Sequence, residues 1–384
     1  MPTNPPPVII LADFVTGRIT GGHQSDYLAA LETAVAPLGT VTIAPYRDGD
    51  RRVGDLPRIS PKTSRLGRYW ESLRFFYRLF GNRRLQLVLF PSPEFRDFLV
   101  FFLASLLRVS RHNTIALFVF RRDAAGIVGR RSWKSRLIDR MVKWLAKRHY
   151  LYPVSDSKVA LRYWEVLTGL SGSLVSIPVR QPAIVKPPKS PAEPLVIGLI
   201  GLFRLEKGAP LYDRVTETAL ASGTPAKVIL QLNASGNAEE ERLAAELRRK
   251  WQDAAKVEII NEHLDSERYA ALLGSLDILV LPYDVASYGV GTSGIMFETL
   301  ALGGVVAATR FEWGLERFQD HPNVIWMEDV EPATIQSALK EAAQLALAGP
   351  KAQIPDDFSE TWHATIQRAL AGLPKSRFDA RPGC

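Results

Sequence analysis

Residues 278–304 read ILVLPYDVASYGVGTSGIMFETLALGG, an apolar run followed by a glycine-rich loop and a second apolar segment. The first run is typical of a buried strand, and the Gly-Thr-Ser-Gly tetrapeptide at 291–294 is typical of a helix start. Such a helix start offers backbone N–H groups and the hydroxyls of Thr292 and Ser293 to an anion. The stretch therefore predicts a strand, an anion-binding loop and a helix in succession.

Glu298 adds a carboxylate to this candidate site from within the expected helix. It follows Gly294 by four residues, about one helical turn, where it can accept hydrogen bonds from both hydroxyls of a ribose. A plainer interpretation stays open, in which a loop hydroxyl caps the helix and Glu298 is solvated.

Short apolar runs of the same kind recur along the whole chain, with amphipathic helical stretches between them. Runs with little alternation indicate parallel strands that are buried on both faces. The expected strands cover 8–12, 41–44, 85–90, 114–120, 149–154, 195–201, 227–232, 257–260, 277–283, 305–309 and 324–327. The sequence therefore predicts an α/β fold with two doubly wound, Rossmann-like domains.

The division into domains follows from length and proline content. A chain of 384 residues is too long for one typical core. We expect a first domain at 1–180, a proline-rich linker at 181–194 and a second domain at 195–355. A helix within 356–384 is expected to return to the first domain, ahead of a frayed tail. The only cysteine is Cys384, which excludes a disulfide framework and a cysteine-based metal site.

Charge is distributed unevenly between the two halves. Residues 1–190 contain 30 Lys and Arg against 13 Asp and Glu, whereas the remainder contains 18 against 27. The first half should therefore face an anionic partner. The longest apolar run, 98–107, is too short to span a bilayer, and no signal peptide opens the chain, so we expect a cytoplasmic protein.

Two further loops are candidates for phosphate binding. Gly21 and Gly22 stand between the first strand and the expected helix at 24–36, where the helix dipole favours phosphate. In the loop that opens the second domain, Arg204 and Lys207 can clamp a diphosphate with one planar fork and one point charge. The alternative for the Gly21 loop is a simple glycine turn. The alternative for the loop of Arg204 and Lys207 is a solvated basic turn.

Together these motifs resemble the retaining glycosyltransferases of the GT-B fold, in the group-four class that uses nucleotide-diphosphate sugars. The resemblance covers nearly the whole chain. It implies two domains facing a central cleft, and a diphosphate held by Arg204 and Lys207, whose charges assist its departure. It also implies that Glu298 binds the ribose and that Ser293, Gly294 and Ile295 offer backbone groups to the phosphates and the sugar. Neither a metal ion nor a cofactor beyond the sugar donor is implied.

The chain departs from the family pattern in two places. The family carries a glutamate eight residues before Glu298, where this chain has Val290. The family often carries a histidine after the fourth strand, where this chain has Arg122 and Asp123. Either residue is a candidate for contact with the donor sugar or the acceptor, and a helix cap is the alternative for Asp123.

Other residues are weaker candidates for the site. His23, beside the first glycine loop, and Tyr283 and Tyr288, before the second helix start, are candidates for contact with the acceptor or the sugar. Asp48 and Asp50 are similar to a metal-binding Asp-x-Asp pair, but they lie among arginines with no third ligand nearby, so we expect no metal site.

The basic first half also predicts a membrane surface as a partner. Segments 62–84 and 133–152 mix aromatic residues with Lys and Arg, which suits a peripheral position on anionic lipid. In the second segment, the residues expected on one apolar helix face are Trp133, Leu137, Met141 and Trp144 or Leu145. The alternative is a helix packed on its own sheet with a solvated basic rim.

The sequence thus predicts a glycosyltransferase that moves a sugar, with retention, from a nucleotide-diphosphate sugar to a lipid-linked or glycan acceptor. Surface or exopolysaccharide assembly at the inner face of the cell membrane is the expected setting. An inverting GT-B transferase or a sugar-nucleotide epimerase is the alternative of the same fold. A non-catalytic nucleic-acid-binding protein is the alternative of another class, but it leaves the Glu298 loop unexplained, so we expect no nucleic acid partner.

Overall fold

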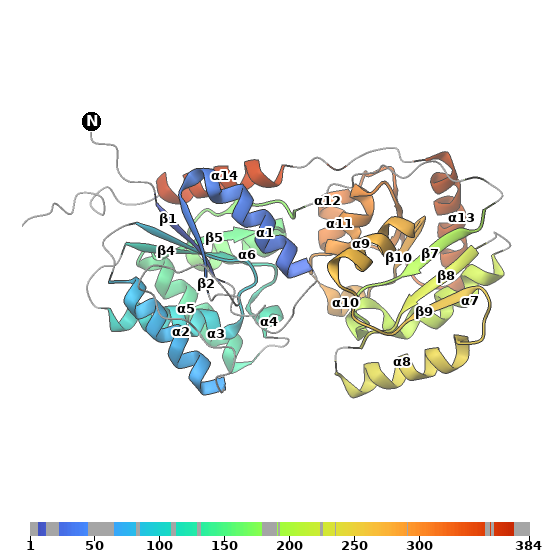
Figure 1. The fold of residues 1–384 in the computed structure, drawn as a ribbon, viewed down its shortest axis with the longest axis horizontal. Coiled ribbons are helices and arrows are strands. Elements are labelled where there is room, and N and C mark those ends of the chain that lie inside the picture. Colours follow the sequence, from blue (N-terminus) through green and yellow to red (C-terminus); the bar gives the residue numbers. More distant parts are fainter. Residues whose placement is uncertain are drawn as a thin grey trace, which may run out of the picture. The chain divides into compact units, whose positions relative to one another are not determined.

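The computed structural model describes residues 7–12, 23–44, 65–81, 85–108, 113–128, 132–178, 190, 193–222, 226–234, 236–289, 291–349, 354 and 357–371. The chain divides into two compact units (Figure 1). One unit contains Met1–Pro178 together with Asp357–Cys384, and the other contains Val179–Asp356. The linker predicted at 181–194 lies almost entirely outside the described residues.

The first unit is built on a six-stranded parallel sheet in the order β2-β1-β3-β4-β5-β6. The chain moves outward from β1 to β2, and β3 then returns to the other side of β1, so the strand order reverses between β1 and β3. The strands are β1 (Val8–Ala12), β2 (Thr40–Ala44), β3 (Gln86–Phe90), β4 (Thr114–Val119), β5 (Leu151–Ser155) and β6 (Ser173–Leu174).

Helices cover both faces of this first sheet. On one face α2, α3, α5 and α6 form an aromatic-rich core with Phe90 and Phe118, whose rings stack at 4.4 Å. On the other face α1 packs against the C-terminal helix α14, and Nε2 of His363 lies 2.6 Å from the carbonyl oxygen of Ala34. The helices are α1 (His23–Val35), η2 (Ala36–Leu38), α2 (Arg65–Leu79), α3 (Phe95–Leu107), α4 (Ala124–Ile127), α5 (Trp133–Lys147), α6 (Lys158–Thr168) and α14 (Phe358–Ala371).

The second unit repeats this plan with the order β12-β11-β10-β7-β8-β9, again all parallel. Its order reverses between β7 and β10, which pair through Ile197 with Ile278 and Gly198 with Leu279. The strands are β7 (Leu195–Leu199), β8 (Ala226–Gln231), β9 (Val257–Ile260), β10 (Ile278–Leu281), β11 (Val305–Thr309) and β12 (Val324–Met327).

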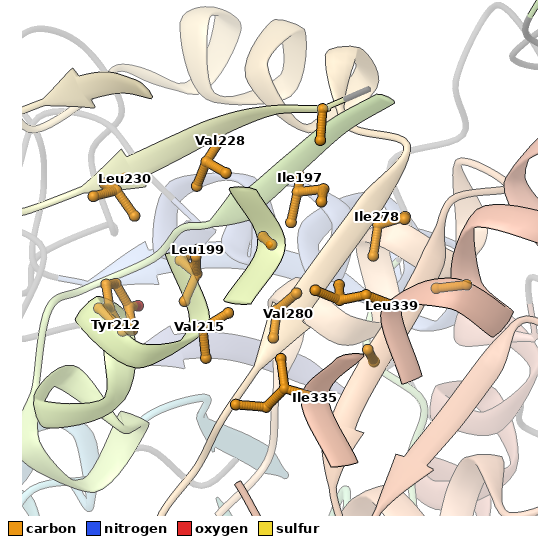
Figure 2. Packing of buried hydrophobic residues seen from close by; sticks show 14 of the residues in the cluster. Ile197, Leu199, Tyr212, Val215, Val228, Leu230, Ile278, Val280, Ile335 and Leu339 are labelled. Atoms are coloured by element: carbon orange, nitrogen blue, oxygen red, sulfur yellow. The ribbon is translucent and has the colours of Figure 1, made fainter. Parts of the chain in front are cut away.

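The core of the second unit joins one face of the sheet to α7, α8 and α13. Figure 2 shows part of it, with Val215 of α7 and Ile335 of α13 directed toward Val280 of the sheet. The helices of this unit are η3 (Leu205–Lys207), η4 (Ala209–Leu211), α7 (Tyr212–Ala221), α8 (Ala238–Trp251), α9 (Ser266–Ser275), α10 (Val285–Tyr288), α11 (Gly294–Ala301), α12 (Glu312–Phe318) and α13 (Pro332–Ala348).

All eleven predicted strands are present, and the α/β class is confirmed. The additional strand β6 has two residues, too few to give a pattern in the sequence. The apolar face predicted on α5 does not face outward. Met141 and Leu145 lie in the core, and Leu137 and Trp144 pack against it, which leaves Trp133 as the exposed member of that face. The helix uses this face to cover its own sheet, as the alternative interpretation had it.

Candidate functional site

The loops that follow β7 and β10 come together where the strand order of the second sheet reverses. The backbone N–H of Asp284 donates to the carbonyl oxygen of Glu206 at 3.2 Å. Gly208 has φ of +79°, and a Cβ at this position would collide with the carbonyl oxygen of Pro282. Ligands of doubly wound folds bind at such a reversal, outside the carboxyl ends of the strands. Gly208 thus fixes one loop on the other at the expected binding position.

Arg204 and Lys207 lie on this first loop, at either end of η3. The Nη1 atom of Arg204 is 3.5 Å from Oε1 of Glu206, and both side chains are partly exposed. Nε of Arg204 is buried and makes no hydrogen bond within the described part of the chain. The loop is anchored from behind by Glu240, which accepts from the N–H of Leu205 at 3.2 Å. The long contact with Glu206 leaves the guanidinium with donors for an anion.

The same loop brings Lys207 close to the start of α11. A Cβ built on Gly201, just after β7, would lie 3.9 Å from Nζ of Lys207 and 3.7 Å from Cδ1 of Ile295. Gly201 itself has φ of +114°, which favours glycine. The ammonium group of Lys207 and the side chain of Ile295, in the first turn of α11, therefore both lie next to this glycine.

The start of α11 is capped by Ser293. Its hydroxyl accepts from the N–H of Met296 at 3.4 Å and contacts the hydroxyl of Tyr283 at 3.0 Å. The serine side chain is thus the N-cap that the sequence left as an alternative. The N–H groups of Gly294 and Ile295 belong to the first turn and have no acceptor within the helix, so they are the donors that an anion would meet.

Tyr283 and Tyr288 shape this loop from behind. Both side chains are buried, with ring centroids 4.2 Å apart. The hydroxyl of Tyr288 donates to the carbonyl oxygen of Thr292 at 2.7 Å, and that of Tyr283 is engaged with Ser293. Both hydroxyls therefore support the helix start, and the contact of these tyrosines with sugar or acceptor stays a prediction.

Glu298 receives a hydrogen bond from a residue that the sequence did not suggest. The hydroxyl of Tyr269, on α9, donates to Oε2 of Glu298 at 3.3 Å. Burial, and then the charge of Glu298, raise the pKa of Tyr269 well above its usual value, so the phenol stays protonated and remains a donor. No local motif marks Tyr269, because its partner is 29 residues away and is reached only through the packing of α9 on α11.

An open pocket of about 460 Å³ lies beside α9. It is lined by the end of β9 and by Leu264 and Arg268, the residue before Tyr269. Arg268 pairs with Glu262 at the rim. Its lining does not include Arg204, Lys207, Ser293 or Glu298.

In the first unit, Gly21 and Gly22 lie outside the described residues, as does the side chain of His23, which begins α1. Asp123 caps α4, with Oδ1 accepting from the N–H of Gly126 at 2.7 Å, so its carboxylate has the structural role that was left open. The carbonyl oxygen of Arg122 accepts from Nε1 of Trp164 at 3.0 Å. The structure thus uses the backbone of Arg122 to fix this loop.

The neighbouring Arg121 was not singled out by the sequence. Its Nε is 3.4 Å from Oδ2 of the buried Asp156, and its guanidinium lies over the ring of Tyr27 at 5.0 Å. Asp48 and Asp50 lie outside the described residues, and within the described part no group of three or more potential ligands is placed to hold a metal ion.

Solved structures resemble this chain over almost its whole length. The sucrose-phosphate synthase of Thermosynechococcus elongatus matches 96% of the chain and 100% of its own, with a TM-score of 0.60 and 16% identity. A glycosyltransferase from Rickettsia africae matches 98% and 100%, with a TM-score of 0.62 and 12% identity. HepE of Anabaena, in complex with UDP and glucose, matches 95% and 100%, with a TM-score of 0.62 and 12% identity.

No protein-family model matches the sequence, and the search of curated proteins gave no match. At these identities the structural similarity shows the fold. The chain has two parallel six-stranded α/β sheets, as in GT-B glycosyltransferases, and the predicted GT-B fold is confirmed.

Proposed function

We propose that this chain is a glycosyltransferase that moves a hexose, with retention, from a nucleotide-diphosphate sugar to a lipid-linked or glycan acceptor. One observation carries the proposal. At the strand-order reversal of the second sheet, Gly208 fixes together the loops that follow β7 and β10. The first loop carries the cations Arg204 and Lys207. The second leads into α11, which offers N–H donors at its start and the carboxylate of Glu298. These groups match a diphosphate and a ribose.

The proposed chemistry is mainly electrostatic. A bond forms between an acceptor hydroxyl oxygen and the anomeric carbon while the bond from that carbon to the diphosphate breaks. The departing diphosphate takes the electron pair and the proton of the acceptor hydroxyl. Arg204, Lys207 and the first turn of α11 would stabilise the negative charge that develops on the leaving group. Glu298, oriented by Tyr269, would hold the ribose at a distance from the reacting bond.

Structures of similar fold support the donor class. The HepE structure holds UDP and glucose, and starch synthase IV of Arabidopsis thaliana, with a TM-score of 0.63 and 10% identity, is bound to ADP and acarbose. Nucleoside diphosphates therefore occupy proteins of this fold. The proposed donor for this chain is the corresponding sugar nucleotide, used without a metal ion.

The proposed setting is polysaccharide assembly at the inner face of the cell membrane, with peripheral attachment. The +17 charge of residues 1–190 supports an anionic partner for the first unit. Within the described part, no helix is long and apolar enough to cross a membrane. A lipid-linked acceptor would bring the substrate to such a surface.

A donor screen by thermal unfolding tests the proposal. UDP, GDP, ADP and their hexose conjugates are added to the protein, and one nucleotide series is expected to raise the melting temperature. A ligand at one hundred times its dissociation constant adds about 2.7 kcal/mol to the free energy of unfolding. Lys207→Ala should reduce this shift, whereas Lys227→Ala, an exposed lysine of β8 paired with Glu258, should leave it unchanged. Stabilisation by none of the nucleotides would contradict the proposal.

A further inference from the structure

Helix α3 is apolar on two faces, although only one of them meets the core. Phe98, Phe101 and Ala104 are buried on the inner face. Leu103, Leu106 and Leu107 are exposed on the outer one, Leu107 with 58% of its surface accessible. A surface helix of a globular protein normally carries polar residues on its outer face. The outer face of α3 is therefore unexplained by the packing of the first unit.

Exposed apolar side chains gather around this helix. The described part of the chain exposes eleven large hydrophobic side chains, and seven of them are on α2, α3 and α5. Besides the three leucines of α3, they are Leu66, Trp70 and Tyr77 on α2 and Trp133 on α5. Trp70 is 67% exposed and Trp133 is 61% exposed, unusual values for tryptophan. We call these seven residues the α3 patch.

Contacts at both ends of α3 join the three helices into one surface. At its C-terminal end, Nε of Arg108 donates to the carbonyl oxygen of Tyr77 at 3.2 Å, and the guanidinium lies over the Tyr77 ring. At its N-terminal end, the rings of Phe95 and Trp133 meet edge to face at 6.0 Å. Figure 1 shows α2, α3 and α5 together on one side of the first sheet.

The charge of this surface is strongly positive. Residues 65–79, 95–108 and 133–148 contain twelve Lys and Arg against three Asp and Glu. Of the acidic residues, Asp97 is buried, and Asp139 accepts from the hydroxyl of Tyr163 at 2.8 Å. Two of the cations lie over exposed aromatic rings of the patch, Arg108 at 4.7 Å from the Tyr77 centroid and Lys134 at 5.8 Å from that of Trp133. Cations next to exposed apolar side chains are typical of proteins that rest in the headgroup region of anionic membranes.

The charge also decides between possible occupants. A second copy of this chain would present the same positive surface, and two such surfaces repel each other. A nucleic acid would satisfy the cations but not the three leucines. An anionic lipid surface satisfies both, because each basic residue near it contributes about 1 kcal/mol and the apolar side chains enter the acyl boundary.

We infer that the α3 patch docks the first unit on anionic membranes, with the outer face of α3 inserted and Trp70, Tyr77 and Trp133 at headgroup level. The inserting residues then lie on α3, and not on the apolar face of α5 that the sequence suggested. This inference deepens the membrane attachment in the proposed function and is independent of the sugar-transfer chemistry.

Flotation with liposomes tests the inference on the full chain. Vesicles of phosphatidylcholine alone are compared with vesicles of equal parts phosphatidylcholine and phosphatidylglycerol, at low and high salt. The wild type should float with the anionic vesicles, less so at high salt. The triple variant Leu103→Ser, Leu106→Ser, Leu107→Ser should lower the partition coefficient by about tenfold or more. Val166→Ser on α6, which removes an even more exposed apolar side chain outside the patch, should float as the wild type does.

A labelling experiment covers the case in which the triple variant does not fold. Cys384 is the only cysteine, so Cys384→Ser with Leu107→Cys places one environment-sensitive dye on the patch. Its emission should shift to the blue with anionic vesicles, and the same dye at Val166→Cys should not shift. Equal shifts at both positions, or flotation of the triple variant like the wild type, would overturn the inference.

These experiments distinguish a failure of the docking inference from a failure of the proposed function. Nucleotide binding, measured by thermal unfolding on the same preparations, should be unchanged in the triple variant. Loss of flotation with intact nucleotide binding supports the patch. Flotation without nucleotide binding in the wild type would leave the patch standing and contradict the proposed function.

Discussion

The hydroxyl of Tyr269 donates a hydrogen bond to Oε2 of Glu298 at 3.3 Å, joining α9 to α11. Such a bond holds that carboxylate oxygen in place. The bond is a side-chain link between these two helices of the second unit. Tyr269 is therefore a positioning residue in the proposed donor site.

Glu298→Ala should lower kcat/KM for the donor by about ten- to a hundredfold, the effect of losing a charge-assisted bond of roughly 1.5 to 3 kcal/mol. Tyr269→Phe keeps the carboxylate and removes only its orientation, so its loss should be smaller and should fall mainly on KM. Steady-state kinetics at varied donor concentration measure both. Wild-type kinetics in Glu298→Ala would reject the ribose assignment.

Gly208→Ala should damage both stability and donor binding, because its Cβ would collide with the carbonyl oxygen of Pro282 and part the two loops. Gly236 is the matched control, since it has a similar φ of +88° but no atom within 4 Å of an added Cβ. Gly236→Ala should cost about 1 to 2 kcal/mol for its backbone conformation alone. Denaturant unfolding and the nucleotide thermal shift should show a clearly larger effect at Gly208, and equal effects would disprove the fixed-loop account.

Chelation should leave activity intact. The phosphate contacts proposed here come from Arg204, Lys207 and the N–H groups of α11. Turnover in EDTA is compared with turnover in added Mg²⁺ or Mn²⁺. Activity that disappears with EDTA and returns with metal would contradict this assignment and direct attention to Asp48 and Asp50.

Asp97 should give the first unit a pH-dependent stability. Burial raises the pKa of its carboxyl from 3.8 to about 6, against the lowering effect of Arg96. The folded state therefore binds this proton more tightly than the unfolded state. Its contribution to the free energy of unfolding is greatest below the unfolded pKa, falls as pH rises from 3.8 to about 6, and is constant above.

The variant Asp97→Asn isolates this effect. Its amide oxygen can still accept from the N–H of Glu94, which donates to Asp97 at 2.7 Å in the wild type. Relative to the wild type, the variant should gain stability between about pH 4 and about pH 7, by on the order of 3 kcal/mol. Urea unfolding of both proteins at the two pH values measures the gain. A difference between them that does not change with pH would show that Asp97 titrates normally.

Eleven strands of the two sheets could be predicted from the sequence, because a buried parallel strand is a continuous apolar run, whereas the two-residue β6 could not. The run at 305–309 gave β11 to the residue. The direction in which the apolar face of α5 points could not be predicted from the sequence. Helical spacing shows that Met141 and Leu145 share a face, but not what covers that face. The structure buries this face of α5 and exposes leucines on the outer face of α3.

For the candidate site, the sequence predicts the charged residues but not the residues that support them. Arg204 and Lys207 lie in a recognisable loop after β7, and Glu298 lies in α11, the helix that follows the β10 loop. The roles of Tyr283 and Tyr288 depend on bonds to the α11 loop, and that of Tyr269 on the packing of α9 against α11, so none of the three could be assigned from spacing.

The most direct test of the proposed function is ¹H NMR of the purified chain with UDP-, GDP- and ADP-hexoses and candidate glycan or lipid-linked acceptors. The proposal predicts release of one nucleoside diphosphate, with formation of a glycoside that keeps the donor's anomeric configuration, and its loss in Lys207→Ala. A product of inverted configuration would contradict retention. No nucleoside diphosphate released from any donor, or equal release by wild type and Lys207→Ala, would contradict the assignment of the site.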